Sequence, residues 1–256
     1  MSNFTETSQS QNSWQDLNTS KRILMGPGPS DVNSRVLNAM ATSMIGHLDP
    51  EFLQVMDEIK EMARRTFLTE NELTFIVSAP GSAGMETTLV NLLEPGDEAV
   101  ICINGVFGTR MAEIAERCGA KVARVEAPWG EPINPEDVKK AIGGSQPKLV
   151  SVVHAETSTG VLQPLQEISD IAHNAGALFV VDAVTSLAGT ELRVDDWGID
   201  AIYSGTQKCI SAPPGLSPVS FSDKAVNVIN NRKTKIQSWF LDVSLVNSYW
   251  SGAKRA

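Results

Sequence analysis

The stretch LVSVVHAETSTGVLQPLQEISDIAHNAGALFVVD, residues 149–182, contains the pattern that repeats along most of this chain. Two short apolar runs, Leu149–Val153 and Leu178–Val181, flank a segment of helical period at Pro164–Ala175. Near-continuous apolar runs are typical of strands that are buried on both faces of a parallel sheet. Helices usually connect such strands. The stretch therefore predicts a strand–helix–strand unit.

The same alternation predicts the rest of the chain. Further strands are expected at Phe75–Ser78, Ala99–Ile103, Lys121–Val125, Ala201–Tyr203 and Val219–Phe221. Further helices are expected at Pro50–Phe67, Met85–Leu93, Thr109–Cys118 and Pro135–Ile142, and one over Arg35–Met40 with Ser30 or Asp31 as its N-cap. Seven strands predict one large α/β domain over residues 21–256, with a mostly parallel sheet flanked by helices and an N-terminal arm over residues 21–49.

Composition and charge restrict the partners. The chain has 21 Lys and Arg against 30 Asp and Glu, so its formal net charge of −9 argues against nucleic acid or an anionic membrane as partner. No apolar run is long enough to span a bilayer. The first 20 residues contain no Lys or Arg and predict a disordered polar tail. Three cysteines without metal-type spacing indicate no metal site and a reducing, cytoplasmic location.

Ligands of parallel α/β sheets bind beyond the carboxyl ends of the strands, so the residues that follow each strand carry the functional prediction. Gly81-Ser82-Ala83-Gly84 precedes the helix expected from Met85, and is either a phosphate site or merely a tight corner. It is not a GxGxxG dinucleotide fingerprint. Phe107 lies between two glycines, and is either an aromatic platform for a planar ligand or a core side chain.

The later strand ends carry polar groups. Thr157 belongs to a loop that is either a hydrogen-bonding site or a polar turn, and His154 before it is more often structural. Asp182 closes an apolar run, where it either caps the next turn or pairs with a protonated ring nitrogen. Gln207 and Lys208 stand among small and apolar residues, where a desolvated lysine can serve as a nucleophile toward aldehydes. A lysine that merely extends its ammonium group to solvent is the alternative.

The order of these groups is more informative than any one of them. A phosphate site, an aromatic platform, a polar loop, a carboxylate and a desolvated lysine follow successive strands of one sheet. Together they fit a planar, phosphorylated aldehyde with a basic ring nitrogen. Pyridoxal phosphate has these features.

Beyond this reading from the residues, the sequence resembles a known family. Its motifs GPGPSDVNSRVLNAM (26–40), GSAGMET (81–87), NGVFG (104–108), HAETSTG (154–160), VDAVTSLAG (181–189) and SGTQKCISAPPG (204–215) resemble those of the class V aminotransferases. The likeness is strongest to their alanine–glyoxylate and serine–glyoxylate (serine–pyruvate) branch. It implies a fold type I pyridoxal-phosphate enzyme.

The resemblance also implies roles for individual residues. Lys208 would hold the cofactor as an aldimine and move the proton, and Asp182 would pair with the ring nitrogen. Phe107, where many relatives have tryptophan, would stack on the ring, and Thr157 would bond near its hydroxyl group. The phosphate would be held by Gly81, Ser82, Ala83 and Gln207. The substrate carboxylate would lie on the side of the pocket that Gly28 lines.

For the whole protein, the resemblance implies transamination of alanine or serine with glyoxylate or pyruvate by a ping-pong mechanism, in a homodimer. Relatives continue into a small C-terminal domain with a substrate-binding arginine, and this chain is expected to be a fragment that lacks it. A peroxisomal signal at that end would alter the cytoplasmic prediction.

Three rival functions are weighed against transamination. A cysteine desulfurase-like lyase usually has histidine before the lysine, where this chain has Gln207, and needs a mobile loop cysteine, which Cys209 is not. A non-catalytic binding protein would not need Asp182 together with Lys208. A nicotinamide dehydrogenase lacks its fingerprint here.

Overall fold

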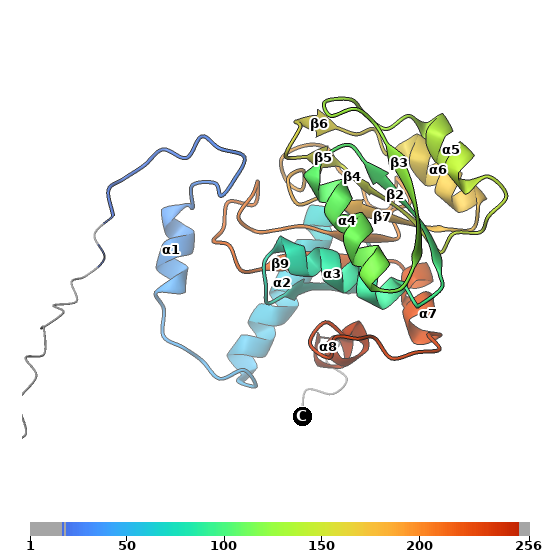
Figure 1. Cartoon of the computed structure of the whole chain (residues 1–256). Helices are drawn as coiled ribbons and strands as arrows, with labels where there is room; N and C mark the ends of the chain where they lie inside the picture. The colour runs from blue at the N-terminus through green and yellow to red at the C-terminus, as the bar shows by residue number, and fades with distance from the viewer. Residues whose placement is uncertain (1–16, 18, 251–256) are drawn as a thin grey trace, which may run out of the picture.

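The computed structural model describes residue 17 and residues 19–250, and a seven-stranded sheet lies at its centre (Figure 1). The strand order is β1-β9-β8-β7-β4-β2-β3. The strands are β1 (Leu73–Val77), β2 (Glu98–Ile103), β3 (Lys121–Glu126), β4 (Leu149–Val153), β7 (Leu178–Asp182), β8 (Ala201–Tyr203) and β9 (Ser217–Phe221). The seven strands expected from the sequence are all present.

One strand runs against the others. β9 pairs antiparallel with both of its neighbours, β8 and β1, whereas every other neighbouring pair is parallel. The prediction of a mostly parallel seven-stranded sheet is therefore confirmed. As a result, the carboxyl ends of six strands meet at one edge of the sheet, and the residues that follow β1, β2, β4, β7 and β8 gather there.

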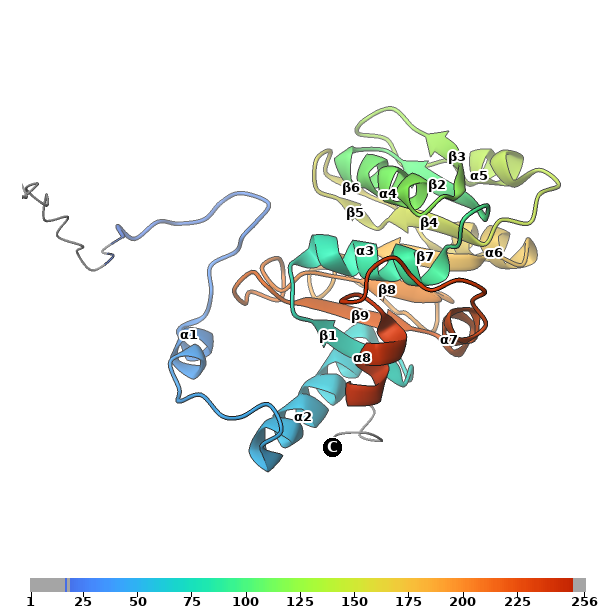
Figure 2. The ribbon, with the colours of Figure 1, turned by 60° about the horizontal axis from the view of Figure 1, so that its bottom comes forward.

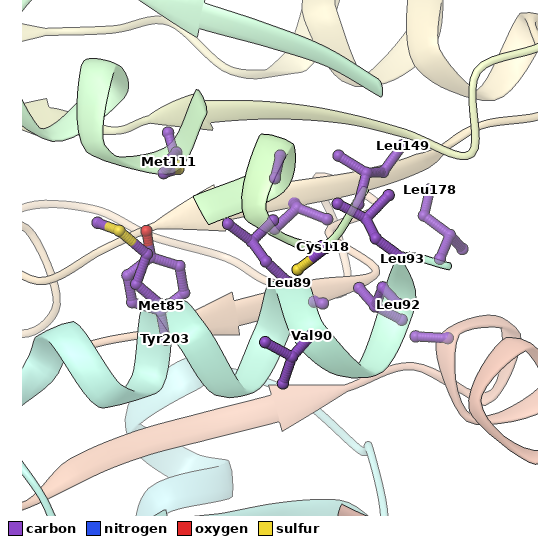
Figure 3. Close-up of a cluster of buried hydrophobic side chains, with 14 of the residues drawn as sticks. Met85, Leu89, Val90, Leu92, Leu93, Met111, Cys118, Leu149, Leu178 and Tyr203 are labelled. Atoms are coloured by element: carbon purple, nitrogen blue, oxygen red, sulfur yellow. The ribbon is translucent and has the colours of Figure 1, made fainter. Parts of the chain in front are cut away.

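Helices cover both faces of the sheet. Alternate residues along β2 show why both faces are covered, since Ile101 and Ile103 join one buried cluster and Val100 and Cys102 the other. One face is covered by α3 (Gly81–Leu92), α4 (Val106–Arg117), α7 (Asp223–Asn230) and α8 (Val243–Trp250), and the other by α2 (Pro50–Phe67), α5 (Pro135–Ile142) and α6 (Gln166–Asn174). Figure 3 shows the core between α3, α4 and the sheet, with Leu89 and Met111 among its side chains.

Two helices at the functional edge begin earlier than expected. α3 begins at Gly81 and not near Met85, and α4 begins at Val106 and not at Thr109. The apolar periodicity of these helices starts only where they reach the core. Their glycine-rich first turns therefore give no hydrophobic signal, although glycine is compatible with helical backbone there.

Some elements were not expected from the sequence. They are the hairpin of β5 (Ala155–Glu156) and β6 (Val161–Leu162), and the helices α7 and α8. Residues of the segment 235–250 pack against the core. Leu241 and Val243 are buried, and the Trp250 ring lies 6.2 Å from the ring of Phe75. These apolar residues belong to the hydrophobic cluster on the face of the sheet that α3 covers.

Helix α1 of the N-terminal arm stands apart from the body. Both views show the segment that carries α1 (Ser34–Met40) away from the sheet (Figures 1 and 2), and α1 has no buried residue. Asn33, and neither Ser30 nor Asp31, caps α1 by accepting from the Arg35 N–H. The predicted tail over residues 1–20 lies almost entirely outside the described residues. Within the described chain, no helix has the length and apolarity to cross a membrane.

Candidate active site

Residues that follow β1, β2, β4 and β7 meet in space at this edge of the sheet. Ser82 after β1 accepts a hydrogen bond from Arg110 in α4, and Phe107 donates its N–H to Glu156 after β4. Thr157 lies in hydrogen-bonding contact with Thr185, which follows β7. The carboxyl edge of the sheet therefore forms one polar site made from segments far apart in the sequence.

Asp182 is a deeply buried carboxylate of this site. It is 2% exposed, and lies opposite Tyr203 where β7 and β8 pair. Its Oδ1 accepts from the Val184 N–H at 2.8 Å, and its Oδ2 accepts from the Tyr203 hydroxyl at 2.9 Å. Burial raises the pKa of Asp182 to about 6, against the opposing effect of these two bonds. Asp182 does cap the next turn, and its oxygens also retain lone pairs for a cationic partner.

Lys208 lies beneath the N-terminal arm. Its Nζ donates to the Pro27 carbonyl at 3.0 Å, and the Ser30 hydroxyl donates to the Lys208 carbonyl at 2.7 Å. A Cβ on Gly28 would lie 2.5 Å from this Nζ, and the φ of +142° at Gly28 is one that side-chain-bearing residues rarely adopt. Lys208 is half-buried in this structure. The carbonyl of the arm keeps its ammonium group hydrogen-bonded.

The start of α3 presents backbone donors. No side chain caps this helix, since its N-cap residue is Pro80. Helix N-termini of this kind attract anions. Gly81 is buried, and a Cβ there would lie 3.1 Å from Val184. Ser82 is exposed and Ala83 is half-buried, and both stand in the same first turn.

Gln207 offers a further group beside this helix start. Its Oε1 is buried and has no hydrogen-bond partner among the described residues. It lies close to Gly205, because a Cβ there would be 2.9 Å from this oxygen. A 180° rotation of the side-chain amide puts an N–H donor in the same place. The orphaned amide and the uncapped helix together provide what a bound phosphate needs.

Phe107 lies in the first turn of α4 and not in a loop. Its ring is half-buried, and the guanidinium carbon of Arg110 lies 5.0 Å from the ring centroid. Arg110 Nη1 also donates to Ser82 Oγ at 3.2 Å. Arg110 therefore links the aromatic side chain to the start of α3.

Thr157 borders a hollow at this edge. A cavity of about 270 Å³ is lined by Pro27, Glu156, Thr157 and Thr185, with apolar residues of the β5–β6 hairpin. The hydroxyl groups of Thr157 and Thr185 bond to each other across two of the strand ends. The hollow thus lies between the arm, which contacts Lys208, and the loop that carries Thr157.

Sequence reasoning missed several residues that contact the predicted ones, among them Arg110, Thr185, Val184 and Tyr203. One of them carries a usable signal. Arg110 follows Phe107 by three residues, which puts both on one helix face once the helix is known to begin at Val106. Tyr203 ends the strand next to Asp182, but the strand order that makes them neighbours is not visible in the sequence.

Two groups considered from the sequence lie outside this arrangement. The His154 ring packs edge-on against Trp197, with ring centroids 5.8 Å apart, and burial lowers its pKa to about 4. It is therefore neutral at pH 7. Cys102 and Cys118 are buried in the core, and Cys209 is exposed. The residues that the structure describes include no group of three or more metal-binding side chains.

The arrangement has a defined chemical capacity. It combines a primary amine, a buried carboxylate, a helix start open to an anion, and an aromatic ring. The orphaned Oε1 of Gln207 and the uncapped start of α3 indicate that these parts fit a bound group. Such a set suits a phosphorylated aldehyde with a cationic ring, which is the chemistry of pyridoxal phosphate.

Comparison with known proteins supports this interpretation. A sequence model of the class V aminotransferases matches residues 32–249. Alanine–glyoxylate aminotransferase of Rattus norvegicus is 45% identical over 234 residues, which are 91% of this chain and 56% of that protein. The (S)-ureidoglycine–glyoxylate transaminase of Bacillus subtilis is 39% identical over 254 residues, which cover 92% of this chain and 61% of that protein.

Solved structures show the same likeness. The crystal structure of an alanine–glyoxylate aminotransferase from Nostoc sp. superimposes with a TM-score of 0.94 at 41% identity, over 99% of this chain and 67% of that one. The chain spans a little over half the length of the curated relatives that it matches. Proteins of this family depend on pyridoxal phosphate.

Proposed function

Because this chain belongs to the class V aminotransferases, we propose that it transfers the amino group of a small amino acid, alanine or serine, to glyoxylate or pyruvate. Relatives named as alanine–glyoxylate aminotransferases are up to 45% identical to it, which supports alanine and glyoxylate as the first choice. A ping-pong mechanism follows, since one site must accept the amino group before the second substrate enters.

One observation carries the proposal. Lys208 follows β8, and Asp182 ends the adjacent strand β7, so an amine and a buried carboxylate flank one site. Bound pyridoxal phosphate supplies a carbonyl group for the amine and a ring that withdraws electrons from the substrate. Lys208 is the nucleophile and, later, the group that moves the proton at the substrate's Cα. The Asp182 carboxylate keeps a proton on the ring nitrogen by its negative charge.

The remaining side chains orient the cofactor in this proposal. The Phe107 ring stacks on the cofactor ring, and the Thr157 hydroxyl bonds near the ring's oxygen. Gly81, Ser82, Ala83 and Gln207 bind the phosphate through the open N-terminus of α3 and the Gln207 amide. Gly28 lines the side where the substrate carboxylate lies, because the arm passes there over Lys208.

A different amino donor is the closest alternative. The similarity to a protein named as an (S)-ureidoglycine–glyoxylate transaminase favours ureidoglycine as a second candidate. A cysteine desulfurase-like lyase is less favoured. Cys209, the cysteine beside Lys208, donates its thiol to the Thr185 carbonyl at 3.3 Å, and Gln207 stands where such lyases would be expected to have histidine. A binding protein without catalysis has no use for the pair of Asp182 and Lys208.

The test is a visible absorbance spectrum with pyridoxal phosphate, before and after alanine, serine or ureidoglycine is added. We expect a visible band that bleaches with the correct donor and returns with glyoxylate. Lys208→Ala should abolish the cycle, whereas Lys224→Ala, at an exposed lysine of α7, should leave it intact. Bleaching and return that survive in Lys208→Ala would refute the assigned nucleophile. A stable band that no amino acid changes would favour the binding protein.

We also propose the organisation of the whole protein. Residues 21–256 act as a cofactor-binding domain with residues 21–49 as an arm, and two copies form a homodimer. Exposed apolar side chains of the arm, such as Met25 (88% exposed) and Met44 (96% exposed), support this pairing. The three unpaired cysteines support a cytoplasmic location. The remaining partners are the amino acid and 2-oxo acid substrates. Neither nucleic acid nor a membrane is a partner in this proposal.

A further inference from the structure

Helix α4 begins without a cap of its own. Its N-cap residue is Gly105, which has no side chain to accept a hydrogen bond. The first three N–H groups of the helix nevertheless all have partners. Val106 donates to Ser158 Oγ at 3.0 Å, and Phe107 and Gly108 donate to Glu156 Oε2 at 3.1 and 3.3 Å. The β5–β6 hairpin therefore caps α4 from a distant part of the chain.

Glu156 is held rigidly while it does this. It is 1% exposed, and its second oxygen, Oε1, accepts from the Ser158 N–H at 3.1 Å and from the Ser158 hydroxyl at 2.7 Å. Both carboxylate oxygens are thus satisfied without an ion pair among the described residues. The positive end of the α4 dipole stabilises the buried charge.

The chain makes room for this contact at Gly105. A Cβ there would lie 2.5 Å from Glu156 Cδ and from Ser158 Oγ. The backbone of Gly105 is extended, with φ at 172°, a conformation that any residue adopts. Glycine is therefore required for the approach of Glu156 and not for its own backbone angles.

We propose that Glu156 is a positioning residue, which fixes Phe107 and Thr157 relative to one another and so sets the plane of the cofactor ring. Phe107 lies in the turn that Glu156 caps, and Thr157 is the next residue along the chain. Without the cap, the first turn of α4 frays and the Phe107 ring loses its fixed orientation. The proposal rests on the proposed function, which assigns ring contacts to these two side chains.

Glu156 also has an electrostatic effect on Asp182, the residue proposed to pair with the ring nitrogen. Burial is the main cause of the raised pKa of Asp182, and the charge of Glu156 raises it further while Arg110 lowers it. The cap carboxylate therefore lies close enough to the reacting centre to influence it electrostatically.

The test compares Glu156→Ala and Glu156→Gln with the unsubstituted chain, by titration with pyridoxal phosphate. Visible absorbance gives the dissociation constant, and visible circular dichroism shows whether the bound cofactor has one fixed orientation. We expect Glu156→Ala to weaken binding at least tenfold and to lose most of the dichroism per bound cofactor. Glu156→Gln should have a dissociation constant and a dichroism between those of Glu156→Ala and the unsubstituted chain. Its amide oxygen can accept from Phe107 and Gly108, but its amide N–H groups would face the N–H of Ser158.

The matched control is Asn134→Ala. Asn134 caps α5 through the Glu136 N–H, at 3.0 Å, and touches none of the site residues. Its loss should lower stability but leave the dissociation constant within twofold. If Glu156→Ala does not fold, Glu156→Gln with this control still decides the outcome.

Amide hydrogen exchange of residues 106–108 tests the cap without cofactor. We expect faster exchange in Glu156→Ala, and unchanged exchange would overturn the proposal because the cap would not exist. Unchanged cofactor affinity and dichroism in folded Glu156 variants would overturn it too, because the cap would not position the ring. If the unsubstituted chain binds no cofactor, the proposed function fails and the ring-positioning role fails with it. The exchange experiment then reports on the cap alone.

Discussion

Asp182 and Tyr203 show how burial and hydrogen bonding act in opposite directions on the pKa of one carboxyl group. The carboxylate is enclosed between β7 and β8, and burial raises its pKa from an ordinary 3.8 to about 6. The Tyr203 hydroxyl opposes this shift. Burial raises the pKa of that phenol well above its usual value, so Tyr203 remains a donor throughout the physiological range.

We expect the unliganded chain to lose stability as the pH rises from about 4 to about 6 because of Asp182. The folded state binds this proton more tightly than the unfolded state, so raising the pH favours unfolding. A pKa shift of this size corresponds to roughly 3 kcal/mol, at about 1.4 kcal/mol per pH unit. Tyr203→Phe should extend the loss above pH 6, because it removes a hydrogen bond to the charged form. Urea unfolding at several pH values measures both effects.

Asp182→Asn is the reference for this experiment, because it removes the titrating group and keeps the shape. The reference is needed since burial lowers the pKa of His154 to about 4, which makes stability rise with pH over a similar range. If the wild-type protein and Asp182→Asn had the same pH dependence, Asp182 would have no raised pKa in the folded state.

At the scale of elements, the close packing of α3 on the sheet depends on Gly84. A Cβ there would collide with Ser217 Oγ and lie 3.1 Å from Tyr203 Cβ. Ser217 cannot rotate freely, because its hydroxyl is buried and donates to the Ser204 carbonyl at 2.6 Å. Gly84 therefore brings α3 close to β8 and β9, which positions the helix start near Gly205.

Gly84→Ala should lower the free energy of unfolding by about 1–3 kcal/mol, since overpacking outweighs the better helix propensity of alanine. The double variant Gly84→Ala/Ser217→Ala should be more stable than the sum of the single changes, because removing the hydroxyl relieves the collision. Urea unfolding of the four proteins gives the coupling energy. Additive effects would mean that the contact between these two positions is unimportant.

At the scale of the whole molecule, α1 of the arm presents apolar side chains that are exposed in the described chain. Leu37 and Met40 of α1 are 51% and 66% exposed, and α1 packs on no core. A helix of seven residues is too short to be stable alone in water. A second copy of the chain would bury these side chains.

We expect light scattering to give a mass near 55 kDa, which is twice the chain mass of 27.6 kDa. Leu37→Glu with Met40→Glu should shift the protein toward the monomer, because buried charges are costly at an interface. Leu162→Glu is the matched control, since Leu162 is 53% exposed on the β5–β6 hairpin and lies outside the arm. A monomeric wild-type protein would exclude the homodimer.

Local patterns were sufficient for most of the fold. Apolar runs such as Leu149–Val153 predicted every strand of the sheet, because strands buried on both faces require apolar residues throughout. Predicted helix boundaries were wrong where the sequence has no apolar periodicity. The start of α3 at Gly81 carries no apolar period, and the short α7 and α8 were not expected.

The candidate site, like the fold, was predicted in part from the sequence and decided in part by the tertiary structure. The sequence alone determined which chemical groups follow each strand, from Gly81 to Lys208, because parallel strands place their carboxyl ends at one edge whatever their order. Only the tertiary structure decided which groups touch, since strand order and the path of the arm depend on packing between distant segments. That is why the Tyr203–Asp182 bond, the Pro27 carbonyl on Lys208 and the Glu156 cap of α4 became visible only in the folded chain.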